Sequence, residues 1–259
     1  MKARFSFFNG IFGILGASLV IFVLLPLAST VFSSSAPRLV QTLTDPQVLR
    51  SIGLTFQASA LSTGIAALTG VPLAYLLARR RFWGKRLVEG IIDLPVVVPH
   101  TAAGIALLMV FGGRGLLGDP LGRLGIYFTD RLAGIVVAML FVSLPYLVNM
   151  SREAFALIDP ELEKNALVEG ASPWQAFCYV SLPLAWRGVL SGALMMWARG
   201  ISEFGAVVIL AYHPKIAPVL IYELFNGFGL SAALPVAALL ILAALLVFVF
   251  LRWLSGTAD

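Results

Sequence analysis

Charged residues are scarce in this chain of 259 residues: Asp, Glu, Lys and Arg together make up 12% of it. A soluble domain of this length carries about 25% charged and about 45–50% apolar residues. Here the hydrophobic share is 59% and the mean hydropathy is +0.95. These values exclude a soluble enzyme, a disordered tail and a collagen-like chain. Uncharged stretches of membrane-spanning length recur throughout, which predicts a single polytopic membrane domain over residues 1–259.

Cysteine and histidine are also scarce. Cys178 is the single cysteine, which excludes an internal disulfide framework and a cysteine-based metal cluster. His100 and His213 lie far apart without the spacing of metal ligands, so no metal site is expected. The sequence has no G-x-x-x-x-G-K-[ST] loop that could cradle the phosphates of ATP, and the G-x-G-x-x-G at 113–118 lacks the strand and helix that this fingerprint requires. An active transporter with this sequence must take its energy from a partner or an ion gradient.

Six apolar stretches are long enough to cross a membrane, whose core of about 30 Å takes roughly 20 residues of helix. The first is longer than the apolar segment of a signal peptide, so we interpret it as a retained helix. The sequence therefore predicts an all-α polytopic membrane protein with six transmembrane helices, at 7–31, 51–78, 87–111, 132–150, 188–211 and 234–251.

The basic residues predict the orientation of these helices. Six spans place both termini on one side, and Lys and Arg are enriched in cytoplasmic loops. With both termini in the cytoplasm, the inner side receives Lys2, Arg4 and the basic run at 79–86, and so the larger share of the basic residues. That run could instead bind anionic lipid specifically. Topology accounts for the formal net charge of +5 without a nucleic-acid partner, and none is expected.

The fourth connection, at 151–187, is the longest polar segment. Asp159 is suited to cap a helix, Pro160 fits the first helical position, and the acidic residues that follow lie at the positive end of the helix dipole. Gly170 supplies a stop. A first helix is therefore expected between Asp159 and Gly170.

A second, short helix is expected directly afterwards. Ser172 and Gln175 have the spacing of a capping box, and Pro183 is expected to mark the end of this helix. The small residues Ala166 and Gly170 lie four apart, so another surface could approach the first helix closely. The pair of helices either docks a partner in the cytoplasm or packs only against its own bundle.

Residues 162–183 resemble the cytoplasmic EAA loop of ABC importer permeases, whose pattern is Glu-Ala-Ala, three residues, Gly, nine residues, Ile, any residue and Leu-Pro. Gly170, Leu182 and Pro183 are in register, and Val180 replaces the Ile. The opening triplet departs from the pattern, because it reads Lys-Asn-Ala at 164–166. Glu163 lies one position too early to serve as the Glu of the triplet.

In that family the loop forms a coupling helix that sits in a cleft of the ATP-hydrolysing subunit. The resemblance implies a cytoplasmic coupling helix between spans four and five. It carries this role over to Glu163, Lys164, Asn165, Ala166, Gly170, Ala171, Ser172, Val180, Leu182 and Pro183.

The stretches 93–101, 111–118 and 197–206 resemble the molybdate/tungstate branch of these permeases. The resemblance implies an oxyanion importer that works by alternating access in the cytoplasmic membrane of a prokaryote. Its expected partners are a second copy of the chain, two ABC ATPase subunits that use ATP and Mg, and an external oxyanion-binding protein. The outer loops 112–118 and 212–226 are candidate docking surfaces for that protein. No cofactor is expected in this chain and no catalytic residue is assigned.

The alternative function is a gradient-driven secondary transporter or channel. Such a protein needs an internal repeat and several paired ions within the membrane. The sequence shows no clear repeat and one close charge pair, Arg199 and Glu203. An intramembrane enzyme would need a nucleophile with its base or a pair of aspartates, and neither is evident.

Four residues are candidates for the transport pathway or its gate. Arg199 and Glu203, near the middle of the fifth span and four residues apart on one helical face, either line an anion pathway or hold helices in register. Pro99 and His100, near the middle of the third span, mark either a break that lines a passage or a simple kink with His100 bonded to a neighbouring helix.

A polar stripe on the second span comprises Thr55, Ser59, Ser62 and Thr63. Hydroxyl side chains within a membrane commonly hydrogen-bond to a neighbouring helix. We therefore expect this stripe to join helices rather than to contact the transported substrate.

Overall fold

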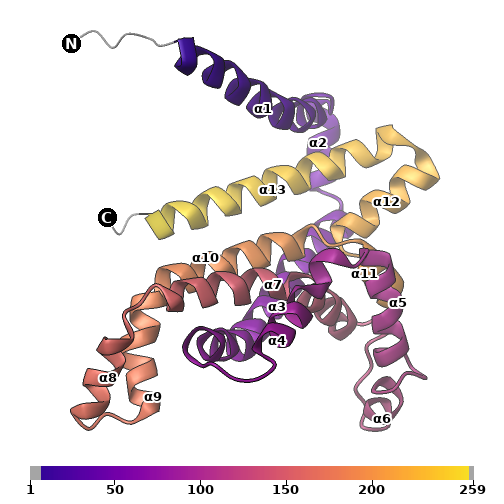
Figure 1. Cartoon of the computed structure of the whole chain (residues 1–259). Coiled ribbons are helices and arrows are strands. Elements are labelled where there is room, and N and C mark those ends of the chain that lie inside the picture. Colours follow the sequence, from indigo (N-terminus) through magenta and orange to yellow (C-terminus); the bar gives the residue numbers. More distant parts are fainter. Residues whose placement is uncertain (1–6, 257–259) are drawn as a thin grey trace.

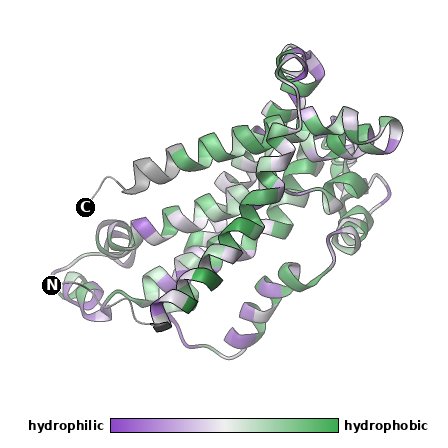
Figure 2. Ribbon diagram, turned by 90° about the horizontal axis from the view of Figure 1, so that it is seen from above, coloured by the Kyte–Doolittle hydropathy of each residue, from purple (hydrophilic) through white to green (hydrophobic). Residues whose placement is uncertain are grey.

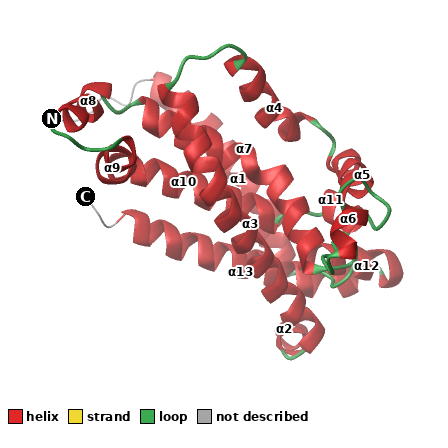
Figure 3. Cartoon of the chain, turned by 90° about the horizontal axis from the view of Figure 1, so that it is seen from below, coloured by secondary structure: helices red, strands yellow, loops and turns green. Residues whose placement is uncertain are grey.

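The computed structural model describes residues 7–256 as helices joined by loops and turns, and it has no strand within that range (Figures 1 and 3). The predicted all-α class is confirmed. Lys2 and Arg4, which contribute to the predicted orientation, lie outside the described residues.

Five helical segments are long and apolar enough to cross a membrane. They are α1 (Phe7–Phe32), α3 (Pro46–Arg79), α7 (Leu132–Ala156), α13 (Leu230–Gly256), and the continuous stretch that ends in α10 (Leu182–Ile201). Hydrophobic residues run along these long helices in Figure 2. A bent pair, α4 (Lys85–Val97) and α5 (His100–Phe111), raises the number of candidate spans to six. The predicted six-helix architecture is therefore confirmed in outline.

The third span is broken rather than kinked. The axes of α4 and α5 differ by 115°, so the simple kink considered from the sequence is wrong. Pro99 has no N–H for a helical hydrogen bond, and its ring disfavours helical geometry in the preceding residue. Val98 accordingly is extended, at φ −71° and ψ 129°. The chain restarts as α5 at His100 in a new direction.

The fifth span also ends earlier than predicted. Instead of one helix over 188–211, α10 ends at Ile201 and a short helix, α11 (Gly205–Leu210), follows after a three-residue connection. The side chain of Glu203 accepts a hydrogen bond from the N–H of Ala206 at 2.9 Å. This bond satisfies a free N–H in the first turn of α11, so the local chemistry favours a new helix start over a continuous helix.

The core lies between α3, α7 and α10, which run side by side (Figure 1). On α7 the side chains of Met139, Leu147 and Phe155 are fully buried, and Leu77 of α3 and Met196 of α10 belong to the same core cluster as Leu147 and Phe155. Close packing of this kind, rather than a hydrophobic driving force, holds helices together in a membrane, because lipid is as apolar as the protein interior. In contrast, α1 lies against α13, and its apolar window is 0% buried within the chain.

Shorter helices occupy the two ends of the bundle. At the left of Figure 1, α8 (Pro160–Val168) and α9 (Pro173–Ala176) project beyond the ends of α7 and α10. At the opposite end lie α6 (Gly118–Arg123) and α12 (Ala217–Phe228). The remaining short helix is α2 (Ala36–Leu43). The segment 212–226, expected as a loop, thus contains most of α12.

Candidate functional site

The first helix of the long loop begins and ends where the sequence indicates. Pro160 is the first residue of α8, and the N–H of Glu161 donates to Oδ1 of Asp159 at 2.9 Å. After α8 the chain turns at Gly170, whose φ is +94°. A residue with a side chain is strained at this angle, so glycine is the residue suited to the turn.

The capping box of the second helix is also present. The N–H of Ser172 donates to Oε1 of Gln175 at 2.8 Å, and the N–H of Gln175 donates to Oγ of Ser172 at 3.2 Å. The prediction that Pro183 ends this helix is wrong. A π-helical turn, Phe177–Ser181, joins α9 to α10, and Pro183 is the second residue of α10.

The residues predicted to couple the loop to the ATPase differ in how far they are exposed. Lys164, Asn165, Gly170, Ser172 and Pro183 are exposed, whereas Glu163, Ala166, Ala171, Val180 and Leu182 are partly buried. Lys164 forms an ion pair with Glu161 at 2.6 Å, and this hydrogen bond raises the pKa of Lys164. Val168 and Trp174 expose large apolar side chains nearby, at 87% and 69%. The loop therefore presents charged and apolar groups outward, as a docking surface requires.

Glu163 has a different role from its neighbours, because its carboxylate points into the bundle. Its Oε1 accepts from Nε of Arg79 at 2.7 Å and from Oγ of Ser181 at 2.6 Å, and its Oε2 accepts from the hydroxyl of Tyr75 at 3.0 Å. From the sequence, Arg79 was expected to orient the helices or to bind anionic lipid, and this network was missed. The available signal was the predicted topology, which puts Arg79 and the loop at the same end of the bundle although they lie far apart in sequence.

The second group of functional candidates lies where the two helix breaks meet. His100 is the first residue of α5, Arg199 is in the last turn of α10, and Glu203 lies in the connection that follows. Nη2 of Arg199 lies 3.1 Å from Oε2 of Glu203 and 2.9 Å from Nδ1 of His100. Nδ1 of His100 lies 3.0 Å from the same carboxylate oxygen. The predicted pairing of Arg199 with Glu203 is confirmed, but their placement on one continuous helix is wrong.

Burial differs strongly within this cluster of His100, Arg199 and Glu203. The side chain of Glu203 is 0% exposed, whereas those of Arg199 and His100 are 20% and 38% exposed. A charged group facing hydrocarbon is costly, so ionisable side chains within membrane segments usually face water or protein. A guanidinium and an imidazole can both donate hydrogen bonds to an anion. The buried carboxylate balances the charge of Arg199 in this structure.

Small residues allow the two broken spans to approach closely at this cluster. A Cβ added to Gly205 would lie 2.8 Å from Cβ of His100, and one added to Gly104 would lie 2.8 Å from Cβ of Ile209. Real carbon atoms do not approach so closely without repacking. Glycine at these positions thus permits α5 and α11 to lie against one another. Pro99 precedes this contact as the residue that caps α5.

Two of the four residues in the polar stripe on α3 join it to other helices, as predicted, and the other two bond within α3. Oγ of Ser59 donates to the carbonyl oxygen of Trp197 on α10 at 2.6 Å, and Oγ1 of Thr55 accepts from the N–H of Ala217 at the start of α12 at 2.8 Å. Ser62 and Thr63 donate to the carbonyl oxygen of Ser59 within their own helix. These bonds satisfy polar groups inside the membrane.

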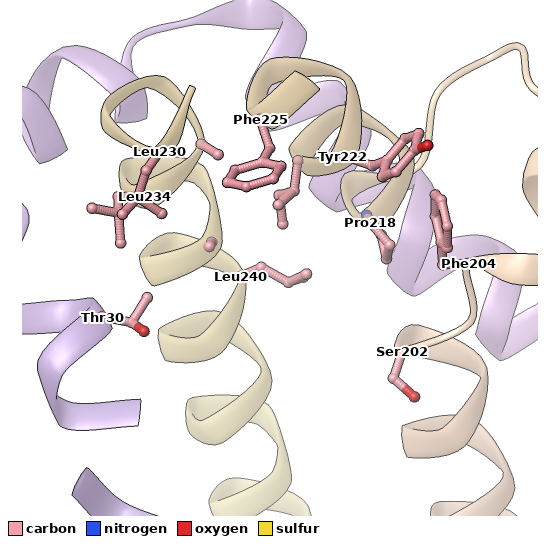
Figure 4. Close-up of a pocket in the computed structure, with 12 residues that line it drawn as sticks. Thr30, Ser202, Phe204, Pro218, Tyr222, Phe225, Leu230, Leu234 and Leu240 are labelled. Carbon is pink, nitrogen blue, oxygen red and sulfur yellow. The ribbon is translucent and has the colours of Figure 1, made fainter. Parts of the chain in front are cut away.

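An apolar cavity of about 600 Å³ lies beside the connection between α10 and α11. Figure 4 shows Phe225, Leu234 and Leu240 facing it, with Ser202 and Phe204 at its edge. No Lys, Arg or His lines this cavity among the described residues. A divalent oxyanion without a cationic partner is strongly disfavoured in such surroundings, so the cavity does not suit one.

The end of the bundle opposite α8 and α9 carries an ionic cluster that sequence reasoning missed. Glu223 of α12 accepts from Nζ of Lys215 at 2.7 Å and from the hydroxyl of Tyr212 at 3.0 Å. The hydrogen bond from Lys215 lowers the pKa of Glu223, and the bond to Glu223 raises the pKa of Tyr212. The N–H of His213 donates to Oδ1 of Asp130 at 2.9 Å. These contacts give the segment 212–226 a defined shape.

Residues 70–256 match the family described as binding-protein-dependent transport system inner membrane component. The chain belongs to this family. It is the multi-pass membrane permease of an ABC importer rather than a catalytic subunit, and its transport system includes an ATPase and a substrate-binding protein. The gradient-driven alternative is therefore set aside.

Several similar proteins align with almost the entire chain. The molybdate/tungstate transport system permease protein WtpB of Thermococcus kodakarensis is 43% identical over 251 residues, 96% of each chain. WtpB of Pyrococcus furiosus is 45% identical over 93% of each chain. The sulfate transport system permease protein CysT of Escherichia coli is 31% identical over 90% of this chain and 87% of its own.

The fold is similar to that of a solved transporter. A bacterial ABC transporter involved in the import of the acidic polysaccharide alginate superposes with a TM-score of 0.78, over 99% of this chain and 97% of that one, at 17% identity. At this identity the likeness shows a shared ABC permease fold and nothing about the substrate.

Proposed function

We propose that this permease moves molybdate or tungstate into the cytoplasm by alternating access. The observation that carries the proposal is the 43–45% identity, over nearly the full length, to permeases named for molybdate and tungstate transport. Identity to the sulfate permease is lower, at 31%. A tetrahedral dianion pays a prohibitive cost on entering hydrocarbon, so its passage requires a protein path that opens to one side at a time.

The proposed assembly contains two copies of the chain, two ATPase subunits and one external binding protein, in the lipid bilayer. ATP and Mg are used by the ATPase, which docks against the loop at 151–187. The outer loops 112–118 and 212–226 receive the binding protein. Their position at the end of the bundle opposite α8 and α9 supports this division of surfaces (Figure 1). Both termini then lie in the cytoplasm, in agreement with the basic run at 79–86.

The proposed pathway or gate includes Pro99, His100, Arg199 and Glu203. Two observations support a role in passage: both helix breaks meet at this cluster, and the side chains of Arg199 and His100 are partly exposed beside a carboxylate that is not. Irregular backbone at membrane depth is tolerated where it is buried in protein or lines a cavity. In a purely structural role, Arg199 and Glu203 would only hold helices in register. The two roles predict different outcomes when both residues are replaced by Gln.

The proposed coupling to ATP is tested in nanodiscs that contain the permease and its cognate ATPase. Adding the binding protein loaded with molybdate is expected to increase ATP hydrolysis, and the empty binding protein is expected to increase it less. If the loaded binding protein leaves hydrolysis at its basal rate, with tungstate and sulfate equally ineffective, the proposed function is wrong.

The choice among oxyanions is tested on the binding protein. Titration of the isolated cognate binding protein with molybdate, tungstate and sulfate is expected to show the tightest binding for one of the first two. Preference for sulfate would contradict the proposed substrate while leaving the assignment to the family unaffected.

A further inference from the structure

The inner end of α3 is fastened to the cytoplasmic loop by a buried ion pair. Arg79, the last residue of α3, donates from Nε to Oε1 of Glu163 at 2.7 Å, and the two side chains are 8% and 12% exposed. Nη1 of Arg79 also donates to the carbonyl oxygen of Ile158 at 3.0 Å. Ile158 lies in the turn between α7 and α8. One guanidinium therefore holds both α8 and the turn that leads into it.

Two hydroxyl groups complete the attachment of Glu163. Tyr75 lies on α3 one helical turn before Arg79, and Ser181 is the last residue of the π-helical turn before α10. Both donate to the carboxylate, at 3.0 and 2.6 Å. The carboxylate of Glu163 thus joins α8 to α3 and to the start of α10.

The buried pair of Arg79 and Glu163 differs from the exposed pair on α8 in what it contributes to stability. Lys164 and Glu161 are 64% and 62% exposed, and exposed pairs contribute little to stability. A buried pair gains little net stability over an apolar pair of the same shape, but it fixes geometry, because either partner alone leaves a buried charge uncompensated. The link between Arg79 and Glu163 is therefore suited to holding a defined arrangement of α8 and α3.

The guanidinium also retains unused binding capacity. Nη2 of Arg79 is buried and has no hydrogen-bond partner among the described residues. Guanidinium and carboxylate groups can form two parallel hydrogen bonds. The pair therefore has the chemical capacity for a second hydrogen bond, through Nη2.

From this joint α3 extends to the cluster at the helix breaks. The helix has 34 residues, and its Ser59 donates to the carbonyl oxygen of Trp197 at 2.6 Å. Trp197 lies two residues before Arg199 on α10. A shift at the inner end of a continuous helix is carried along its length, so α3 provides a contiguous physical link from the loop to the proposed pathway.

We propose that the ion pair between Arg79 and Glu163 is the joint that transmits displacement of the α8–α9 loop to α3, and through Ser59 to the cluster of His100, Arg199 and Glu203. The two residues are positioning residues, since neither contacts the transported ion. The inference rests on the proposed function, in which the loop is the docking surface of the ATPase. It assigns the transmission to Glu163, one position before the triplet that the loop pattern singles out.

The test uses the complete transporter in proteoliposomes and measures molybdate uptake and ATP hydrolysis together. Glu163→Gln is expected to leave hydrolysis within about twofold of the unmodified protein and to lower the molybdate taken up per ATP about tenfold or more, the size of a typical coupling free energy. Arg79→Gln is expected to do the same, and the double variant to be no worse than either single one, because both remove one interaction. Arg79→Lys keeps the charge pair and is expected to restore most of the ratio.

Thr69→Ala is the control on α3, since Oγ1 of Thr69 donates to the carbonyl oxygen of Ile65 within the same helix at 3.1 Å, and it is expected to leave the ratio unchanged. The inference is overturned if Glu163→Gln takes up as much molybdate per ATP as the unmodified protein. It is also overturned if the losses of the two single variants add up in the double variant. If Glu163→Gln does not assemble with the ATPase, Ser181→Ala replaces it: a lowered ratio supports the joint and an unchanged one overturns it. Failure of the unmodified transporter to take up molybdate in an ATP-dependent manner contradicts the proposed function instead.

Discussion

At the scale of single residues, the most specific predictions concern the charged side chains within the membrane-spanning part of the protein. Glu203 is completely buried, and its two oxygens are divided between the N–H of Ala206 and the side chains of Arg199 and His100. The carboxylate therefore acts both as a cap for α11 and as the counterion of Arg199. A change at either charge affects local helix structure and electrostatics together.

Arg199→Gln leaves the carboxylate of Glu203 buried without its cation, which is expected to destabilise the permease by about 3–5 kcal/mol. The double variant Arg199→Gln with Glu203→Gln is expected to recover much of this loss, because neither remaining side chain is charged. Thermal unfolding of the purified variants measures both effects.

Molybdate uptake by the double variant separates the two roles considered for the pair. Stability restored without transport supports a place in the pathway. Stability and transport restored together support a pair that only holds helices in register, and would remove both residues from the proposed gate.

Gly205→Ala places a Cβ 2.8 Å from Cβ of His100, so α5 and α11 must move apart. We expect a loss of about 1–3 kcal/mol, as for overpacking in a tight core. Gly90→Ala is the control, because an added Cβ at Gly90 meets nothing within 4 Å in the middle of α4. The control is expected to gain about 0.5–1 kcal/mol from the helical preference of alanine. Equal unfolding midpoints for the two variants would contradict the close contact.

At the scale of helices, local signals in the sequence predicted the loop well. The cap at Asp159, the turn at Gly170 and the capping box of Ser172 with Gln175 are short-range interactions, so their spacing alone determines them. The prediction that Pro183 ends the second loop helix is wrong because the helix continues through a π-helical turn. A proline is tolerated in the first turn of α10, which follows that turn.

Features set by tertiary contact were not predictable in this way. Apolar composition is the same in a straight and a broken span, so the early end of α10 at Ile201 has no clear hydropathy signal. The contact of Glu163 with Arg79 joins residues 84 positions apart, and the meeting of His100 with Arg199 joins residues 99 positions apart. Such pairs depend on how the helices pack, which a single sequence does not specify.

Ser172→Ala tests the second loop helix. Removing the capping hydroxyl is expected to cost about 0.5–2 kcal/mol locally and to speed amide hydrogen exchange in α9. Ser191→Ala serves as the control, since Oγ of Ser191 only donates to the carbonyl oxygen of Arg187 within α10. Unaltered exchange in α9 of the Ser172 variant would show that tertiary packing, not the cap, holds this helix.

At the scale of the whole molecule, the two ends of the bundle have distinct chemistry. One end carries the α8–α9 loop and the basic run that follows α3, and the other carries α6, α12 and the cluster around Glu223. The orientation of the protein in the membrane is defined by which of these two ends faces the cytoplasm.

Cysteine labelling in intact cells tests the proposed orientation. In a Cys178→Ser background, Leu116→Cys and Trp83→Cys place single thiols at positions that are 78% and 99% exposed, at opposite ends of the bundle. A membrane-impermeant maleimide is expected to label position 116 in intact cells and position 83 only after permeabilisation. The reverse pattern would invert the orientation and place the α8–α9 loop outside.

Uptake of labelled molybdate into proteoliposomes shows whether this chain is the permease of an ATP-driven oxyanion importer. The vesicles contain the permease and its cognate ATPase, with ATP on the ATPase side, the loaded binding protein on the other, and ionophores that abolish ion gradients. We expect uptake to continue with the ionophores present and to stop when the ATP site of the partner is inactivated, because ATP hydrolysis is its energy source. Uptake that survives inactivation of that site would contradict this expectation.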